Sequence, residues 1–266
     1  MNATNTQPAS KSFRIITPHL HLPVMRGVID RRMLVNFRCE ATALARLLPA
    51  PFRPKLVRGW GMAGICLIRL KALRPRWLSM PIGFASENAA HRIAVEWDED
   101  GKWREGVFIP RRDTNSKLNT LAGGRLFPGV HHFARFEVLE SPNRFKLDMR
   151  SEDGEARIRV AARVADAWPA GSVFANLEEA SAFFAAGSLG WSAGNQPGEL
   201  DGLELQSFGW RMEPLIVERV ESSFFHNSTI FPTGTVEFDS ALLMRGIHHE
   251  WHGRGRMLCG NNSCAP

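Results

Sequence analysis

The segment SENAAHRIAVEW, residues 86–97, places a carboxylate and an imidazole at a spacing that suits acid–base chemistry. The segment alternates as a β-strand does, so Glu87 and His91 share one face with four apolar side chains. That face is the more apolar of the two, which predicts that it points into the protein interior. There Glu87 is a candidate general acid or base beside His91, and the alternative is a structural ion pair with Arg111 or Arg125.

The stretch GGRLFPGVHH, residues 123–132, presents an arginine directly after two glycines. The guanidinium of Arg125 has the planar geometry that binds a substrate carboxylate through two hydrogen bonds. The alternative is a salt bridge from Arg125 to Glu87 or Asp113 that organises the loop, since buried arginines are normally paired. In either case Asp113 and Asn115 are expected to cap this loop at the edge of the site, among the substrate-binding residues.

Two adjacent histidines follow the Pro-Gly turn of the same stretch. On a strand their side chains point to opposite faces, so at most one of them faces a pocket. His132 shares its parity with Ala134, Phe136 and Val138, which predicts that His132 faces the interior as an auxiliary catalytic residue. The alternative role is that of a core histidine without chemistry.

Trp191 lies in the glycine-rich segment SLGWSAGNQPGELDG, residues 188–202, which is predicted to be a loop. Its indole is a candidate lid over a bound ligand. The alternative is a surface loop that is anchored by a tryptophan. Trp191 is therefore counted among the substrate-binding candidates.

Known motifs for cofactor binding and for nucleophilic catalysis are missing from the sequence. It contains no dinucleotide fingerprint, no phosphate-binding glycine loop and no nucleophile elbow. The stretch HHEWH, residues 248–252, departs from the HExxH pattern of zinc proteases, and zinc needs three or four converging ligands. The sequence therefore predicts neither a cofactor nor a metal site.

Composition limits the classes of partner. The chain has 266 residues and a formal net charge of +6, but its arginines are spread along the chain, so nucleic-acid binding is not favoured. No apolar run reaches the roughly 18 residues of a membrane helix, so no membrane partner is expected. The polar N-terminus lacks the apolar core of a signal peptide, which predicts a cytoplasmic protein. In such a protein Cys259 and Cys264 of CGNNSC are expected to be reduced thiols, and the alternative is that this segment closes a small loop.

Local patterns predict short helices and hairpins. Three helices are expected near residues 41–48, 115–122 and 176–187. In the last of them, Asn176 is the expected N-cap and Gly187 the residue that ends the helix. An Asp-Gly turn at residues 100–101 is expected to join two strands as a hairpin.

The order of elements predicts a mainly β protein. About ten strand-like segments are interrupted by the three helices without regular alternation, which favours one large, mostly antiparallel barrel or sandwich. A single domain is expected over residues 13–252. A disordered N-terminal tail, 1–12, and a C-terminal tail, 253–266, flank it.

The order and content of these segments resemble the acetoacetate decarboxylase-like superfamily. The resemblance covers about residues 24–250 and involves no single strict motif. It rests on RRMLVNF, LLPAPFRPKLVRGWGMAGICLIRL, SENAAHRIAVEW, GVFIPRRDTNSKLNTLAGGRLFPGVHH and LGWSAGNQPGELDGLELQSFGWRMEPLIVE. Within the superfamily, the chain looks like the bacterial branch described only as a domain of unknown function. The resemblance implies the family's β-barrel with a central small-molecule pocket, and Glu87 matches a glutamate that lines that pocket in the decarboxylases.

The resemblance does not extend to the family's reaction. The decarboxylases form a Schiff base with a lysine in a Gly-Arg and Phe-Pro-Lys-Lys segment, and here Gly129 and Val130 stand at the two lysine positions. Lys117 is the one other lysine in this segment and is a candidate for a relocated Schiff base. The alternative is that Lys117 is a solvated residue in the first turn of a helix.

We therefore expect a pocket that binds a small organic acid or ketone without Schiff-base decarboxylase chemistry. If the protein is an enzyme, the expected reaction is that of a lyase, hydratase or isomerase on such a ligand. The alternative is a non-catalytic ligand-binding or structural protein on the same fold. The sequence leaves a homo-oligomer open.

Overall fold

The structure is a computed structural model that describes residues 13–16, 23–79, 83–122 and 128–259. These residues form fourteen strands and three helices, which confirms the mainly β fold. The strands are β1 (Phe13–Ile16), β2 (Met25–Glu40), β3 (Arg53–Pro54), β4 (Leu56–Val57), β5 (Trp60–Pro75), β6 (Phe84–Glu99), β7 (Lys102–Thr114), β8 (His132–Ser141), β9 (Arg144–Ser151), β10 (Arg157–Val164), β11 (Leu189–Ala193), β12 (Glu199–Phe208), β13 (Glu213–Ser222) and β14 (Val236–Cys259). The helices are α1 (Ala41–Ala45), α2 (Lys117–Ala122) and α3 (Leu177–Ala186).

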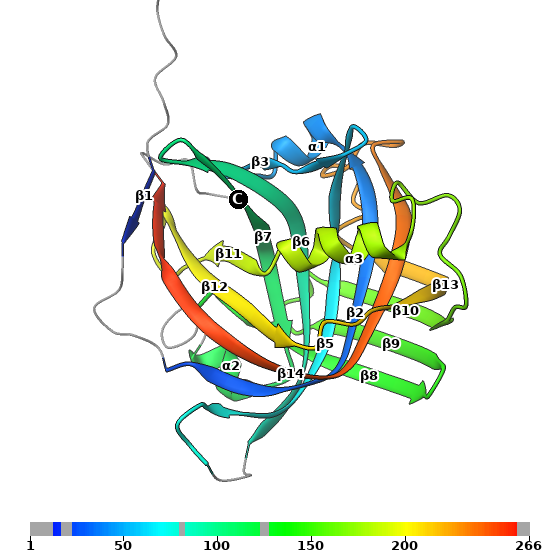
Figure 1. Ribbon diagram of the computed structural model, residues 1–266, viewed down its shortest axis with the longest axis horizontal. Coiled ribbons are helices and arrows are strands. Elements are labelled where there is room, and N and C mark those ends of the chain that lie inside the picture. Colours follow the sequence, from blue (N-terminus) through cyan, green and yellow to red (C-terminus); the bar gives the residue numbers. More distant parts are fainter. Residues whose placement is uncertain (1–12, 17–22, 80–82, 123–127, 260–266) are drawn as a thin grey trace, which may run out of the picture.

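Seven of the strands close into a barrel. Each pairs with the next in the order β12, β11, β7, β6, β5, β2, β14, and β14 pairs back to β12. These pairings are antiparallel except that of β11 with β7, which is parallel. Figure 1 shows the long strands β2, β12 and β14 curving around this barrel, with α3 lying across it.

A second layer of strands packs on one side of the barrel. β8 pairs with β7 and continues as an antiparallel sheet through β9, β10 and β13, and β13 returns to β14. The barrel strands under this layer are therefore buried on both faces. One face contributes Ile65 and Ile93 to a core that includes the second layer, and the other contributes Cys66 and Ala94 to the barrel interior.

Local sequence signals behave as predicted at the joins between elements. Asp100 and Gly101 have positive φ angles of 52° and 79°, the conformation of a two-residue turn between β6 and β7. The Asn176 side chain accepts a hydrogen bond from the Glu179 amide at 2.8 Å, so Asn176 is the N-cap of α3. Gly187 ends that helix, whose buried Phe184 packs in the barrel-interior core.

The glycine-rich segment 188–202 is only partly the predicted loop, because residues 189–193 form β11 and residues 199–202 begin β12, with residues 194–198 as the turn between them. A Cβ on Gly202 would lie 2.6 Å from the Arg254 carbonyl oxygen, so glycine here permits close contact between strands. β14 continues to Cys259, past the domain end expected at residue 252. Cys259 is disulfide-bonded, so the prediction of a reduced thiol is wrong there; Cys264 and the tail 1–12 lie outside the described residues.

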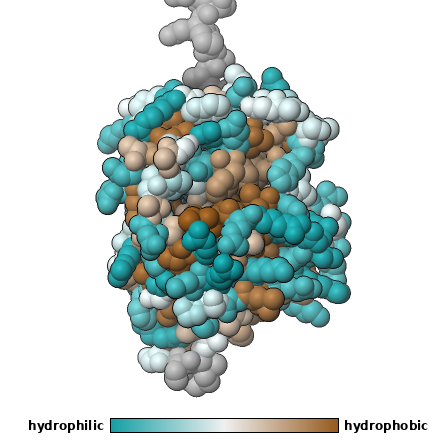
Figure 2. Space-filling model, turned by 90° about the vertical axis from the view of Figure 1, so that its right-hand side faces the viewer, coloured by the Kyte–Doolittle hydropathy of each residue, from teal (hydrophilic) through white to brown (hydrophobic). Residues whose placement is uncertain are grey.

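The described surface mixes charged and apolar side chains. On the side of β9, β10 and β13, a band of apolar side chains lies between hydrophilic ones (Figure 2). Large apolar residues exposed on the second layer include Leu139 of β8 and Ile216 of β13. No helix in the described part of the chain is long and apolar enough to cross a membrane.

Candidate ligand-binding site

A cavity lies inside the seven-stranded barrel. Its volume is about 150 Å³. Each barrel strand contributes residues to its wall, and most of the wall residues are apolar. The polar ones are Arg32, Cys66, Asn88, Arg92, Arg112, Asp113, Asn119, His131 and Ser188.

Three arginines reach this cavity from β2, β6 and β7, and the strand register places them around Cys66 of β5. Arg112 pairs with Ala90 and Ala90 pairs with Cys66, while Arg92 lies two residues from Ala90 on the same face of β6. The Arg32 Nε donates to the Cys66 Sγ at 3.4 Å. Barrel closure therefore gathers three cations from three separate strands in one interior.

The contacts of these arginines within the described residues are with neutral groups. Arg92 donates to the Asn36 side-chain oxygen at 2.6 Å, and the Arg112 Nε donates to the Ser192 Oγ at 3.1 Å. The Arg92 Nε and the Arg32 Nη1 are buried without a hydrogen-bond partner there.

Burial lowers the pKa of Arg92 and of Arg112 to about 10, so both guanidiniums remain charged at neutral pH. A buried cation without a counter-ion is costly.

Two carboxylates approach the cavity, and both are held by other groups. Asp113 is fully buried and pairs with Arg111 at 2.8 Å. Asp201 acts electrostatically on Arg112, but its carboxylate pairs with Arg256 at 3.2 Å and accepts the Gly129 amide at 3.1 Å. Positive charge therefore exceeds negative charge around the cavity.

His131 is the imidazole in the cavity wall. Its Nδ1 lies 2.9 Å from the Gly129 carbonyl oxygen and donates to it, which leaves Nε2 as a hydrogen-bond acceptor. Burial, with a contribution from nearby Arg112, lowers the pKa of His131 to about 4, so the ring is neutral at neutral pH. Strand alternation predicts His132 in the pocket, but the His132 Nδ1 lies 3.1 Å from Asp153 and its side chain is 39% exposed.

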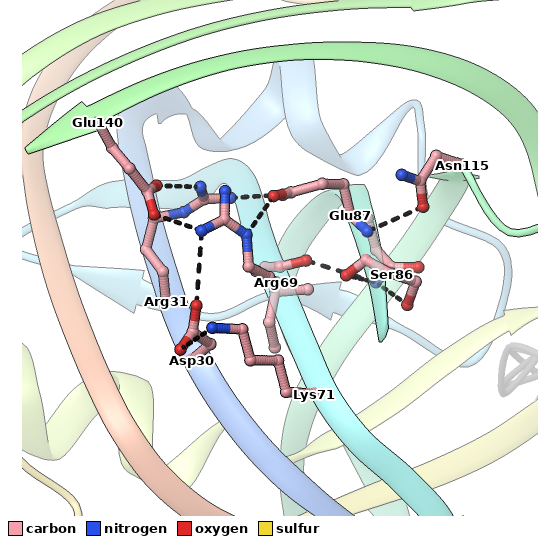
Figure 3. Close-up of polar contacts among 10 residues, drawn as sticks. Asp30, Arg31, Arg69, Lys71, Ser86, Glu87, Asn115 and Glu140 are labelled. Atoms are coloured by element: carbon pink, nitrogen blue, oxygen red, sulfur yellow. Dashed lines mark hydrogen bonds and ion pairs between the residues drawn. The ribbon is translucent and has the colours of Figure 1, made fainter. Parts of the chain in front are cut away.

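Glu87 belongs to an ion-pair network on the opposite face of the barrel wall (Figure 3). Its carboxylate pairs with Arg31 at 2.6 Å and with Arg69 at 2.5 Å, and both arginines also pair with Glu140 of β8. The network connects β2, β5 and β6 to the second layer. The arrangement corresponds to the structural alternative for Glu87, with arginines other than the two expected.

His91 and Trp191 also lie on the face away from the cavity. His91 is 1% exposed and packs against the rings of Phe224 and Phe225, with ring centroids 4.9 and 6.1 Å away. Trp191 is 1% exposed and packs edge-on against Trp97. Because β11 is a buried strand, Trp191 is a core residue here, and it forms neither a lid nor a surface anchor.

The remaining predicted residues differ in their placement. Asn115 is exposed, and its side-chain oxygen accepts the Glu87 amide at 2.9 Å, next to the ion-pair network (Figure 3). Asp113 is in the cavity wall but is engaged by Arg111. Arg125 lies outside the described residues.

The positions that match the family's lysines hold Gly129 and Val130. Gly129 has a φ of +80°, and a Cβ there would lie 2.5 Å from the Ser192 Oγ and 3.1 Å from the Arg112 Nε. Val130 is 37% exposed, and Lys117 is exposed on α2. The described residues that line the cavity include no lysine.

The cavity arginines are not predictable from strand alternation alone, because that criterion treats only the more apolar face as interior. On β7 another sequence signal separates the two adjacent arginines. Arg111 has an acidic residue, Asp113, two positions along on its own face, whereas Arg112 has Thr114 at the same offset. The signal does not extend to β2, where Asp30 lies two positions from the cavity residue Arg32.

A closed barrel with this packed second sheet is the fold of acetoacetate decarboxylase and similar enzymes. The chain is similar to acetoacetate decarboxylase from Legionella pneumophila subsp. pneumophila, with TM-score 0.58 and 12% identity, covering 96% of this chain and 93% of that one. It is also similar to an acetoacetate decarboxylase-like enzyme from Sphingomonas wittichii RW1, with TM-score 0.57 and 14% identity, covering 92% and 99%.

A third similar structure is the enduracididine biosynthesis enzyme MppR with HEPES buffer bound, with TM-score 0.57 and 12% identity, covering 92% of this chain and 88% of that one. Sequence identities this low show the shared fold. No family model matches the chain, and no curated protein matches it. Assignment to the bacterial branch stays a prediction.

Proposed function

We propose that the protein binds a small organic acid in the barrel cavity. The observation that carries this proposal is the convergence of Arg32, Arg92 and Arg112 on a cavity where their described contacts are with neutral groups. A guanidinium binds a carboxylate through two parallel hydrogen bonds, and the contact is stronger where water is excluded. An organic anion therefore provides the missing counter-charge, and the apolar wall accepts its hydrocarbon part.

The proposed binding involves no Schiff base. The cavity wall holds no lysine among the described residues, and Gly129 has neither the φ angle nor the space for one. If the bound acid reacts, the His131 Nε2 is the proton acceptor in the wall, which fits a lyase, hydratase or isomerase step.

A non-catalytic ligand-binding protein is the second candidate. The pKa of His131, lowered to about 4 by burial, favours it because such an imidazole is a weak base.

The test is a thermal-shift series with small organic acids and neutral ketones of similar size. A ligand at 100 times its Kd stabilises the protein by about 2.7 kcal/mol, and for a chain of this size we expect a rise in Tm of roughly 5–10 °C. Acids should produce this rise in the wild type and a clearly smaller rise in Arg112→Gln, while Arg135→Gln, which alters an exposed arginine of β8, should behave as the wild type.

Two results would contradict the proposal. One is that no acid stabilises the wild type, or that acids stabilise Arg112→Gln equally. The other is a covalent adduct, found by mass spectrometry, when borohydride is added to the wild type with a keto acid, because borohydride traps Schiff bases. The same borohydride treatment without keto acid is the control.

A further inference from the structure

We infer that the acid bound in this cavity carries two acidic groups, one at each end of a short hydrocarbon chain. The inference rests on the proposed function and specifies its ligand class. It follows from how the three cavity arginines are distributed over the barrel wall, from their number, and from the size and polarity of the cavity between them.

The arginines lie at three levels along β5, the strand between them. Arg92 of β6 pairs with Gly64 of β5, and Arg32 of β2 pairs with Ile68 of β5. Arg112 of β7 pairs with Ala90 of β6, which in turn pairs with Cys66 of β5. Neighbouring levels are two residues apart, so the backbone positions of the outer two are separated by roughly 13 Å along the strand direction. The Arg32 Nε reaches the Cys66 Sγ of β5 and the Arg92 guanidinium reaches Asn36 of β2. The Arg112 Nε instead reaches Ser192 of β11, so the three guanidiniums are divided between two sides of the cavity wall.

The charge count leads to the same conclusion. Three guanidiniums reach the cavity, and of the two carboxylates described near it, Asp113 is paired with Arg111 and Asp201, which acts on Arg112, is shared with Arg256. A monoanion leaves most of the positive charge uncompensated, and within the part of the chain that the structure describes the Arg32 Nη1 and Arg92 Nε are buried donors without acceptors. A ligand with two carboxylates supplies four acceptor oxygens, enough to reach donors on both sides of the cavity.

The cavity also limits the ligand's size and its middle portion. A volume of about 150 Å³ holds about ten water-sized positions, which suits a molecule of about ten non-hydrogen atoms. Much of the remaining wall is apolar and includes Ile68 and Leu70 from β5 and Leu203 and Leu205 from β12. Short saturated diacids such as glutarate and adipate combine this size with an apolar middle and two charged ends.

Isothermal titration calorimetry on the full chain at low salt tests the inference. The probes are glutarate and adipate, the monoacids pentanoate and hexanoate with the same carbon numbers, and phenyl phosphate as a one-ended dianion. We expect the diacids to bind at least about tenfold more tightly than the matching monoacids. In Arg32→Gln and in Arg112→Gln the diacids should fall to the affinity of the monoacids, whereas Arg135→Gln should keep the full difference.

The outcomes separate this inference from the proposed function. Equal affinity for diacids and monoacids in the wild type overturns the two-ended ligand but leaves acid binding intact. Tightest binding of phenyl phosphate likewise overturns it, in favour of a single dianionic head. If no acid binds, the proposed function fails together with the inference. The wild-type series decides the question even if an arginine variant does not fold.

Discussion

Arg111 and Arg112 are adjacent on β7 and lie on opposite faces of it, so they form a matched pair for testing the charge balance of the cavity. Arg111 pairs with the fully buried Asp113 and with Asp153, both at 2.8 Å. Arg112 forms no ion pair within the described residues and donates to the Ser192 hydroxyl. We predict opposite changes in stability when each arginine is replaced by methionine, which keeps an unbranched apolar side chain and removes the charge.

Replacing Arg112 should stabilise the ligand-free protein. Burial lowers the pKa of Arg112 from 12.5 to about 10, which corresponds to a cost of about 3 kcal/mol for keeping the buried side chain charged. Loss of the hydrogen bond to Ser192 subtracts about 1.5 kcal/mol. Arg112→Met should therefore raise the free energy of unfolding by about 1–2 kcal/mol, in line with the replacement of buried charges by apolar side chains.

Replacing Arg111 should have the reverse effect. Arg111→Met leaves the Asp113 carboxylate buried without its cation, and removal of one partner of a buried ion pair costs about 3–5 kcal/mol. The two variants differ by one position in the chain, so they should lie on opposite sides of the wild type in stability.

Urea denaturation without ligand, followed by circular dichroism, measures both changes. Arg135→Met on the exposed surface of β8 is the control and should stay within about 0.5 kcal/mol of the wild type. If Arg112→Met is destabilised as strongly as Arg111→Met, the Arg112 charge is already compensated in the ligand-free protein. The argument for an anion in the cavity would then lose its physical basis.

Three further predictions concern other parts of the structure. Glu87→Gln should lower the free energy of unfolding by about 3 kcal/mol in urea denaturation, because it leaves Arg31 and Arg69 without this partner, and calorimetry should show organic acids binding as in the wild type. Gly129→Lys should destabilise the protein by roughly 1–3 kcal/mol, because φ is +80° and the Cβ meets Ser192, and mass spectrometry should find no borohydride-trapped adduct. Burial lowers the pKa of His91 to about 3, below its unfolded value of 6.5, so the unfolded chain binds the extra proton and stability falls as the pH drops from about 6.5. At pH 5 the His91 contribution to this loss is about 2 kcal/mol, and His131 and His249, whose pKa values burial lowers to about 4, add to it. In urea denaturation His91→Leu should therefore reduce the loss between pH 7 and pH 5 by about 2 kcal/mol, and an unchanged loss would contradict the assignment.

The features that could be predicted from the sequence are those determined by near neighbours in the chain. The turn at Asp100 and Gly101 depends on two residues that accept positive φ angles, and the start of α3 depends on one side chain that caps it. The alternation of the strand that contains Glu87 and His91 was also predictable, because successive side chains must point to opposite faces.

The location of the cavity could not be predicted by the same means. The strand β6 is buried on both faces, and each face packs in a different core. The more apolar face can therefore be recognised from the sequence, but the sequence does not show which of the two cores contains a ligand site. The more apolar face of β6 packs under the second layer, and the face with Asn88, Ala90 and Arg92 lines the barrel. Which strands close the barrel depends on pairings between residues far apart in the chain, such as β12 with β14, and no local pattern encodes them.

The two pairs of adjacent arginines, one on β2 and one on β7, nevertheless contain information about function once it is known which face of each strand lines the cavity. On β2, Arg31 faces away from the cavity and is ion-paired with Glu87, while Arg32 faces the cavity and has no carboxylate partner among the described residues. On β7, Arg111 and Arg112 divide in the same way. A general enrichment of the chain in arginine would not place the ion-paired side chains on one face of a strand and the side chains without a described carboxylate partner on the other. Retention of unpaired guanidiniums on the cavity side, at a cost in stability that the other side avoids, is the arrangement expected if an acidic ligand completes the cavity.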